Sequence, residues 1–123
     1  MSAPNVVNVA TITAKSAQVA IGNSATQILS NTADSGKVFK VNMLMIANID
    51  GTNAADITVN LHPQDDIAGT GVAIVSTISV PADATLVVLD KNTALYLEEN
   101  KSLAGIASAT GDLVATISYE EIS

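Results

Sequence analysis

Apolar and polar residues alternate in short runs along most of this chain, which is the period expected of β-strands that bury one face. Clusters of Gly, Pro, Asn, Asp and Ser separate these runs and predict turns between them. Strands are expected at residues 6–12, 15–21, 25–30, 37–49, 57–62, 72–80, 85–89, 94–97, 103–109 and 113–122. Their number and even spacing, without helices between them, predict an all-β fold: an antiparallel β-sandwich, jelly-roll-like or Greek-key, of eight to ten short strands.

The strongest predicted strand is the segment KVFKVNMLMIANI at 37–49. Its length and two-sided apolar character predict a central strand that is covered on both faces over 43–47, with Met43 and Met45 packed in the core. A helix is the alternative, but the turn signal at 50–53 and the alternation at 57–62 favour a β-hairpin.

The turn signal Thr-Gly-Asp at 110–112 predicts a second hairpin between the last two strands. The polar stretch HPQDDIAGTG at 62–71 is expected to be a surface loop with a short helical turn.

Both ends of the chain are expected to lie at sheet edges. Residues 5–12 carry apolar side chains on both faces, which suits a strand that joins either its own sheet or the sheet of a neighbouring subunit. We therefore expect residues 1–14 to be an N-terminal arm or edge strand and residues 15–123 to be a single β-sandwich domain. Val6, Val7, Val9 and Ile12 are the partner-binding candidates of this arm. The closing segment ISYEEIS reads as a strand with no tail after it.

The amino-acid composition argues against several classes of function. The formal net charge is −7, from twelve acidic side chains against five lysines, and the three aromatic residues are Phe39, Tyr96 and Tyr119. Nucleic acid is disfavoured as a partner, because its binding needs Lys and Arg for phosphates and aromatic rings for bases. The longest apolar run, at 43–47, is too short to cross a membrane. With no secretory signal at the start of the chain, we expect a soluble protein made in the cytoplasm.

Few residues in the chain suggest chemistry. With no cysteine, a thiolate metal site is impossible. His62 with Gln64, Asp65 and Asp66 is a weak candidate for a metal site and is more simply a solvated loop. No Gly-x-Ser-x-Gly turn is present, so we expect no catalytic site, cofactor or metal.

Two pairs of adjacent acids occur at 98–99 and at Glu120-Glu121. Neighbouring strand residues point to opposite faces, so neither pair should converge on one bond as a glycosidase requires. They are expected to be solvent-facing charges that deter edge-to-edge aggregation. Glu120 and Glu121 are also candidates to meet a basic patch on a partner.

Four segments carry a resemblance to a known group: KVFKVNMLMIANID, NAADITVNLHP, VPADATLVVLD and GDLVATISYEEIS. Together they resemble small virion structural proteins of tailed bacteriophages, particularly the β-sandwich head decoration or cement proteins. The similarity covers most of the chain from Ser35 onward and is one of pattern, without a diagnostic motif. It implies a non-enzymatic homotrimer on the capsid surface of the virion, where it would clamp subunits of the major capsid protein together.

Two alternatives remain open. The same pattern also resembles other small phage parts, such as a neck, tail or fibre-adaptor component. A receptor-binding or glycan-binding β-sandwich is the second alternative, although the scarcity of aromatic residues disfavours it.

Overall fold

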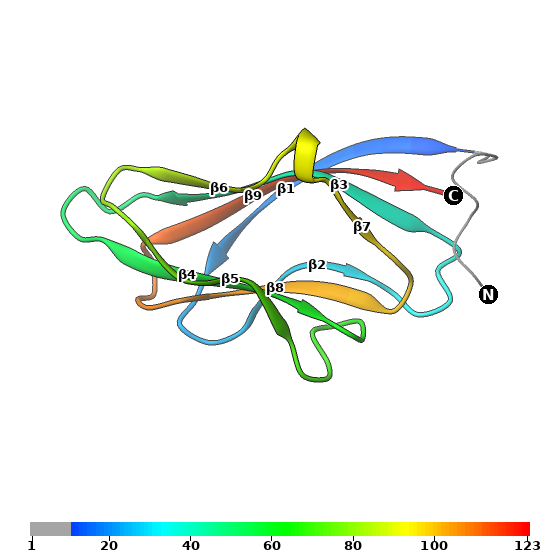
Figure 1. Ribbon diagram of the computed structural model, residues 1–123, viewed down its shortest axis with the longest axis horizontal. Helices are drawn as coiled ribbons and strands as arrows, with labels where there is room; N and C mark the ends of the chain where they lie inside the picture. The colour runs from blue at the N-terminus through cyan, green and yellow to red at the C-terminus, as the bar shows by residue number, and fades with distance from the viewer. Residues whose placement is uncertain (1–10) are drawn as a thin grey trace.

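The protein is a sandwich of two antiparallel β-sheets, which form the upper and lower layers in Figure 1. The computed structural model describes residues 11–123, so the candidate positions Val6, Val7 and Val9 lie outside the described part of the chain. The elements are β1 (Ile12–Ile21), β2 (Thr26–Asn31), β3 (Val38–Asn48), β4 (Ala55–His62), β5 (Val72–Val80), β6 (Thr85–Leu89), the 3-10 helix η1 (Lys91–Thr93), β7 (Leu95–Leu97), β8 (Lys101–Ala107) and β9 (Leu113–Ile122).

The strand order is that of a jelly roll. Sheet 1 has the order β1-β9-β3-β6, with β7 also paired to β3, and sheet 2 has the order β2-β8-β4-β5. Four nested antiparallel pairs, β1 with β9, β2 with β8, β3 with β6 and β4 with β5, make the chain one long folded ribbon. Rolling up this ribbon places its strands in two facing sheets. The predicted all-β antiparallel sandwich is confirmed, and its order is the jelly roll.

Both predicted hairpins are wrong. β3 and β4 lie in different sheets, and so do β8 and β9, so the turns at 50–53 and 110–112 carry the chain from one layer to the other. Among the described strands, β4 and β5 are the one consecutive pair that is hydrogen-bonded. A turn signal reports only that the backbone reverses, whereas burial against the other layer decides where the next strand goes.

The loop between β4 and β5 has no right-handed helical turn. Asp66 and Ile67 both have positive φ, 52° and 53°, and the N–H of Ala68 donates to the carbonyl of Asp65 over 3.1 Å. Two successive positive φ values are the mark of a type I′ turn. The expected helical turn is therefore replaced by a tight turn of the opposite hand.

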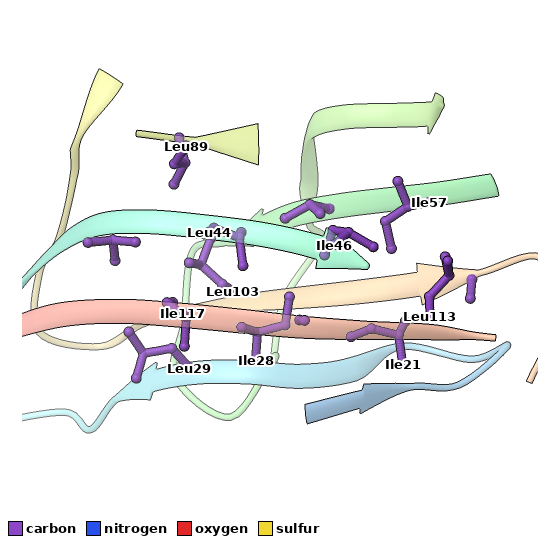
Figure 2. Packing of buried hydrophobic residues seen from close by; sticks show 14 of the residues in the cluster. Ile21, Ile28, Leu29, Leu44, Ile46, Ile57, Leu89, Leu103, Leu113 and Ile117 are labelled. Carbon is purple, nitrogen blue, oxygen red and sulfur yellow. The ribbon is translucent and has the colours of Figure 1, made fainter. Parts of the chain in front are cut away.

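The core lies between the layers, and Figure 2 shows its side chains from both sheets pointing toward one another. Along β3, Leu44 and Ile46 are fully buried, whereas Met43 and Met45 are only half-buried and lie outside the core cluster. The prediction that 43–47 is covered on both faces, with both methionines in the core, is wrong. In a two-layer sandwich each sheet packs on one side only, so the methionines lie on the side of sheet 1 that faces away from sheet 2.

Two buried asparagines join the layers. Asn31, at the end of β2 in sheet 2, donates from Nδ2 to the carbonyl of Leu97 in sheet 1 over 3.0 Å. Asn48, at the end of β3 in sheet 1, donates from Nδ2 to the carbonyl of Val80 in sheet 2 over 2.9 Å. A buried amide with these partners satisfies carbonyls that would otherwise lack a donor at a strand end. The two sheets are therefore held together by hydrogen bonds as well as by the apolar core.

Candidate interaction surfaces

His62 is not part of a solvated loop. It ends β4 with 7% of its surface exposed, and neither ring nitrogen has a hydrogen-bond partner within the described residues. Its ring packs against Gly71, where an added Cβ would lie 2.7 Å from Nε2. The ring therefore fills a tight space between the end of β4 and the start of β5.

The acids that follow His62 in the sequence are used elsewhere. A carboxylate oxygen of Asp65 accepts from the backbone N–H of Ala33 at 3.0 Å, and a carboxylate oxygen of Asp66 lies 3.5 Å from the Oγ of Ser30. Over residues 11–123, no three His, Cys, Asp or Glu side chains are grouped so that they could hold a metal ion. These acids tie the loop to the β2 side of sheet 2.

The two candidate glutamates at the end of β9 lie in different surroundings. Glu121 is bracketed by two lysines, with its carboxylate 2.7 Å from Nζ of Lys37 and 3.0 Å from Nζ of Lys15. The hydrogen bonds from Lys37 and then Lys15 lower the pKa of Glu121, and Glu121 in turn raises the pKa of Lys15. Glu120 is hydrogen-bonded to the side-chain amide of Asn42, 3.3 Å away. Within residues 11–123 Glu120 forms no ion pair, although Lys40 lies opposite it in register, so of the two glutamates it is the freer to meet a partner.

Ile12 begins an edge strand of its own sheet. It lies opposite Ile122 of β9 and is 56% exposed. Almost every residue from Ile12 to Ala20 is exposed, because β1 pairs with β9 along its length while sheet 2 leaves it uncovered. For the part of the predicted arm that is described, residues 12–14 belong to the chain's own sheet.

The outer face of sheet 1, the side turned away from sheet 2, has an uncharged centre. In register across the four strands lie Gln18, Thr116, Met45 and Val87, and beside this row lie Ser16, Ser118 and Met43. Gln18 donates to the hydroxyl of Thr116 over 3.0 Å. In a chain of net charge −7, a broad face of hydroxyl, amide and thioether groups is a candidate contact surface.

A shallow hollow opens on the same face beside η1, which stands above the upper layer in Figure 1. It measures about 400 Å³ and is lined by Asn42, Met43, Asp90, Lys91 and Ser118. The carboxylate of Asp90 is occupied as the N-cap of η1, where it accepts from the backbone N–H groups of Asn92 and Thr93. The lining has no histidine, and its one carboxylate, that of Asp90, is held by the N-cap hydrogen bonds, so the hollow offers shape and hydrogen bonds to a partner.

A second candidate surface is the side of the sandwich where sheet 2 ends in β5 and sheet 1 ends in β6 and β7; we call it the β5–β6 edge. The described residues include seven exposed large apolar side chains, and five of them belong to these three strands. The five are Val72, Ile74, Ile78, Val87 and Tyr96. Sequence analysis missed this surface, although one signal was present: residues 67–89 carry a single charged side chain, Asp83.

Asp50 and Asp112 lie together at one end of the sandwich and have a structural role. The carboxylate of Asp50 accepts the backbone N–H groups of Thr52 and Asn53, and these hydrogen bonds lower its pKa. Partial desolvation, and then the neighbouring charge of Asp50, raise the pKa of Asp112. Asp50 therefore orders the turn at 50–53, and Asp112 of the neighbouring turn lies beside it.

Comparison with known proteins identifies no family for this chain. No protein-family model matches it, and a search of curated proteins finds no significant relative. Within residues 11–123, no helix has the length and apolar character needed to span a membrane.

Proposed function

We propose that this chain is a non-enzymatic structural protein of a bacteriophage virion, a decoration protein that binds the outer capsid surface and stabilises contacts between major capsid protein subunits. The single observation that carries the proposal is the outer face of sheet 1, whose centre is uncharged and offers a broad contact area. The resemblance of the segments from Ser35 onward to phage decoration proteins supports it, and the jelly-roll sandwich is a fold used in viral capsid domains. A jelly roll also serves many other functions, so the fold alone does not carry the argument.

The proposed mechanism is stabilisation by preferential binding. A chain that binds assembled capsid and not free subunits shifts the assembly equilibrium toward the shell. At a free concentration one hundred times its dissociation constant, each occupied site contributes about 2.7 kcal/mol. Repetition over the shell multiplies this effect, so no single site needs a large energy.

The chemistry of the outer face suits a neutral partner surface. Met43 and Met45 adapt their shape to an irregular partner, and Thr116 and Ser118 supply hydroxyls for hydrogen bonds. Lys40 and Glu120 lie opposite each other in register at one end of the face, so charge lies at its rim and not at its centre. Such a distribution is typical of interfaces that exclude water at the centre and fix orientation at the rim.

The N-terminal segment is a second proposed contact. Val6, Val7, Val9 and Ile12 are apolar residues that a neighbouring capsid subunit would bury. Deletion of residues 2–11, which leaves β1 whole, tests the first three of them. We expect the truncated chain to lose affinity for shells. Unchanged affinity would remove the arm from the proposal and leave the outer face as the contact.

The decisive experiment has two parts. Mass spectrometry and cryo-microscopy of purified virions from the source test whether the chain lies on the shell. Recombinant chain is then added to shells assembled without it, and bound chain and shell melting temperature are measured. We expect saturable binding and a raised melting temperature; absence of the chain from virions, or an unchanged shell, would reject the function.

Substitutions locate the contact. Met45→Lys places a charge at the centre of the outer face, whereas Asn23→Lys places the same charge in the exposed turn between β1 and β2. We expect the first to abolish shell binding and the second to leave it intact, with both variants folded by circular dichroism. Equal binding by both variants would exclude the outer face.

The same particle images separate the alternatives. Density at the portal vertex or along the tail would assign the chain to the neck, tail or fibre-adaptor group. Retention of the chain on immobilised host cells, reversed by free glycan, would favour a receptor-binding module.

A further inference from the structure

The β5–β6 edge is apolar because core-facing positions of β5 are left partly uncovered. Val72, Val75 and Ile78 lie opposite Leu61, Val59 and Ile57 of β4, and the last two of these are fully buried. Yet Ile78 is 44% exposed and Val72 is 72% exposed. β5 has nine residues, whereas β6, the last strand of the facing layer at this end, has five. The apolar interior therefore continues to the surface along this side of the sandwich.

Strand β5 is irregular, so a partner would contact its side chains and would not pair with its backbone. The register between β4 and β5 shifts at two places, and Thr77 has a φ of 51° with its N–H bonded to the hydroxyl of Thr58. Bulges of this kind interrupt the regular row of backbone groups that another strand would need for pairing. A partner that covers this edge would pack against Val72, Ile74 and Ile78.

Charge identifies the partner. Two copies of a chain with net charge −7 repel each other over most of their surface. The strands β5, β6 and β7 contain no charged residue, and Lys101 lines a hollow together with Val72. Two copies that meet through these strands therefore bring few like charges together. An apolar surface is also complementary to itself around a symmetry axis.

We propose that the β5–β6 edge is the surface through which copies of this chain associate, with β5 nearest the symmetry axis. The exposed side chains Val72, Ile74 and Ile78 form the centre of the contact. In a decoration protein this contact would build the homo-oligomer that binds the shell. The inference does not rest on that function, because association is measured in solution without a capsid.

The first test is the mass of the purified chain by light scattering and sedimentation, at concentrations up to about 100 μM, which detects dissociation constants of that order. We expect a dimer or trimer. Val72→Glu and Val72→Lys should each weaken association about tenfold or more, because each variant places like charges against each other in a desolvated contact. A mixture of the two variants should recover association, since a Glu of one copy then faces a Lys of another.

The matched control is Asn23→Glu, which places the same charge in the exposed turn between β1 and β2, and β2 is the edge strand of sheet 2 opposite β5. It should leave the mass unchanged. A chain that is monomeric at every concentration overturns the proposal. So does an oligomer that dissociates with Asn23→Glu and survives Val72→Glu.

A covalent test uses the absence of cysteine from the chain. Val72→Cys and Ile78→Cys each introduce a single thiol, and mild oxidation should join copies through it where the proposed contact brings those positions together. Asn23→Cys, in the exposed turn between β1 and β2, should stay monomeric on a denaturing gel. Cross-linking at Asn23 with none at Val72 and Ile78 would contradict the assignment.

Discussion

Asn48 offers the sharpest test of how the two sheets are held together. Its side chain is 3% exposed. Nδ2 donates to the carbonyls of Asn53 at 3.0 Å and Val80 at 2.9 Å, and Oδ1 accepts the N–H of Asp50 at 2.9 Å. Because Val80 ends β5 in sheet 2, the second bond crosses the sandwich. Replacing this one amide removes a hydrogen bond between the two sheets. It also removes the hydrogen bonds that order the turn after β3.

The magnitude follows from these three bonds. Asn48→Ala loses all of them, and at about 1 kcal/mol net for each bond the free energy of unfolding should fall by about 3 kcal/mol. Asn48→Asp keeps the shape but turns a carboxylate oxygen toward two carbonyls, so at neutral pH its loss should exceed that of alanine and reach about 4 kcal/mol or more. Acid should narrow the difference, because a protonated Asp regains one donor.

Urea unfolding followed by circular dichroism measures the loss, provided that the slope with urea is the same for all variants. The matched control is Asn23→Asp, which makes the same chemical change at an exposed turn and should shift the free energy of unfolding by less than about 0.5 kcal/mol. The reasoning is refuted if Asn48→Asp is as stable as the native chain, or if its free energy of unfolding falls by no more than that of Asn23→Asp.

Three further predictions concern single side chains. Glu121→Gln should lower the free energy of unfolding by at most about 1 kcal/mol above pH 4.5, the ordinary pKa of a glutamate. Because the two lysines lower the pKa of Glu121 in the folded chain, the stabilisation is complete above pH 4.5 and is lost as the pH falls through the lowered pKa. Urea unfolding from pH 7 to pH 2 should therefore show a difference between native chain and variant that vanishes in acid. Gly71→Ala should cost about 1–3 kcal/mol, because its Cβ would lie 2.7 Å from Nε2 of His62 and 2.9 Å from Cβ of Asn60; an unchanged melting temperature would show that this packing is loose. His62→Leu should raise the free energy of unfolding by about 1 kcal/mol at pH 7, because it removes two buried ring nitrogens that have no partner within residues 11–123. A fall of similar size would mean that water satisfies these nitrogens.

Sequence periodicity predicted the strands well where local chemistry bounds them. The expected strands at 72–80, 85–89 and 113–122 coincide with β5, β6 and β9. Each lies between turn-forming residues, and the preference of β-branched side chains for extended backbone is a local property. The resemblance to phage decoration proteins was likewise a matter of pattern, so the capsid function stays a prediction.

The sequence identified the candidate site residues by their chemical type but did not predict their surroundings. That Glu120 and Glu121 point to opposite faces follows from the pleat of a strand. That Glu121 lies between Lys15 and Lys37 does not, because these lysines are far away in sequence and approach it only when β1 and β3 flank β9. His62 could be identified as the single histidine, but its burial against Gly71 depends on the return of β5 alongside β4.

The sequence by itself determined that this chain is all-β and roughly where its strands lie, and its net charge of −7 predicts that nucleic acid is a disfavoured partner. These properties follow from the order and kind of residues within short windows. Only the tertiary structure decided which strands pair, which face of β3 is covered, and that β5 exposes apolar side chains. Strand pairing and exposure depend on how much of one sheet the other sheet covers. The covered area is set by strands that are far apart in the sequence.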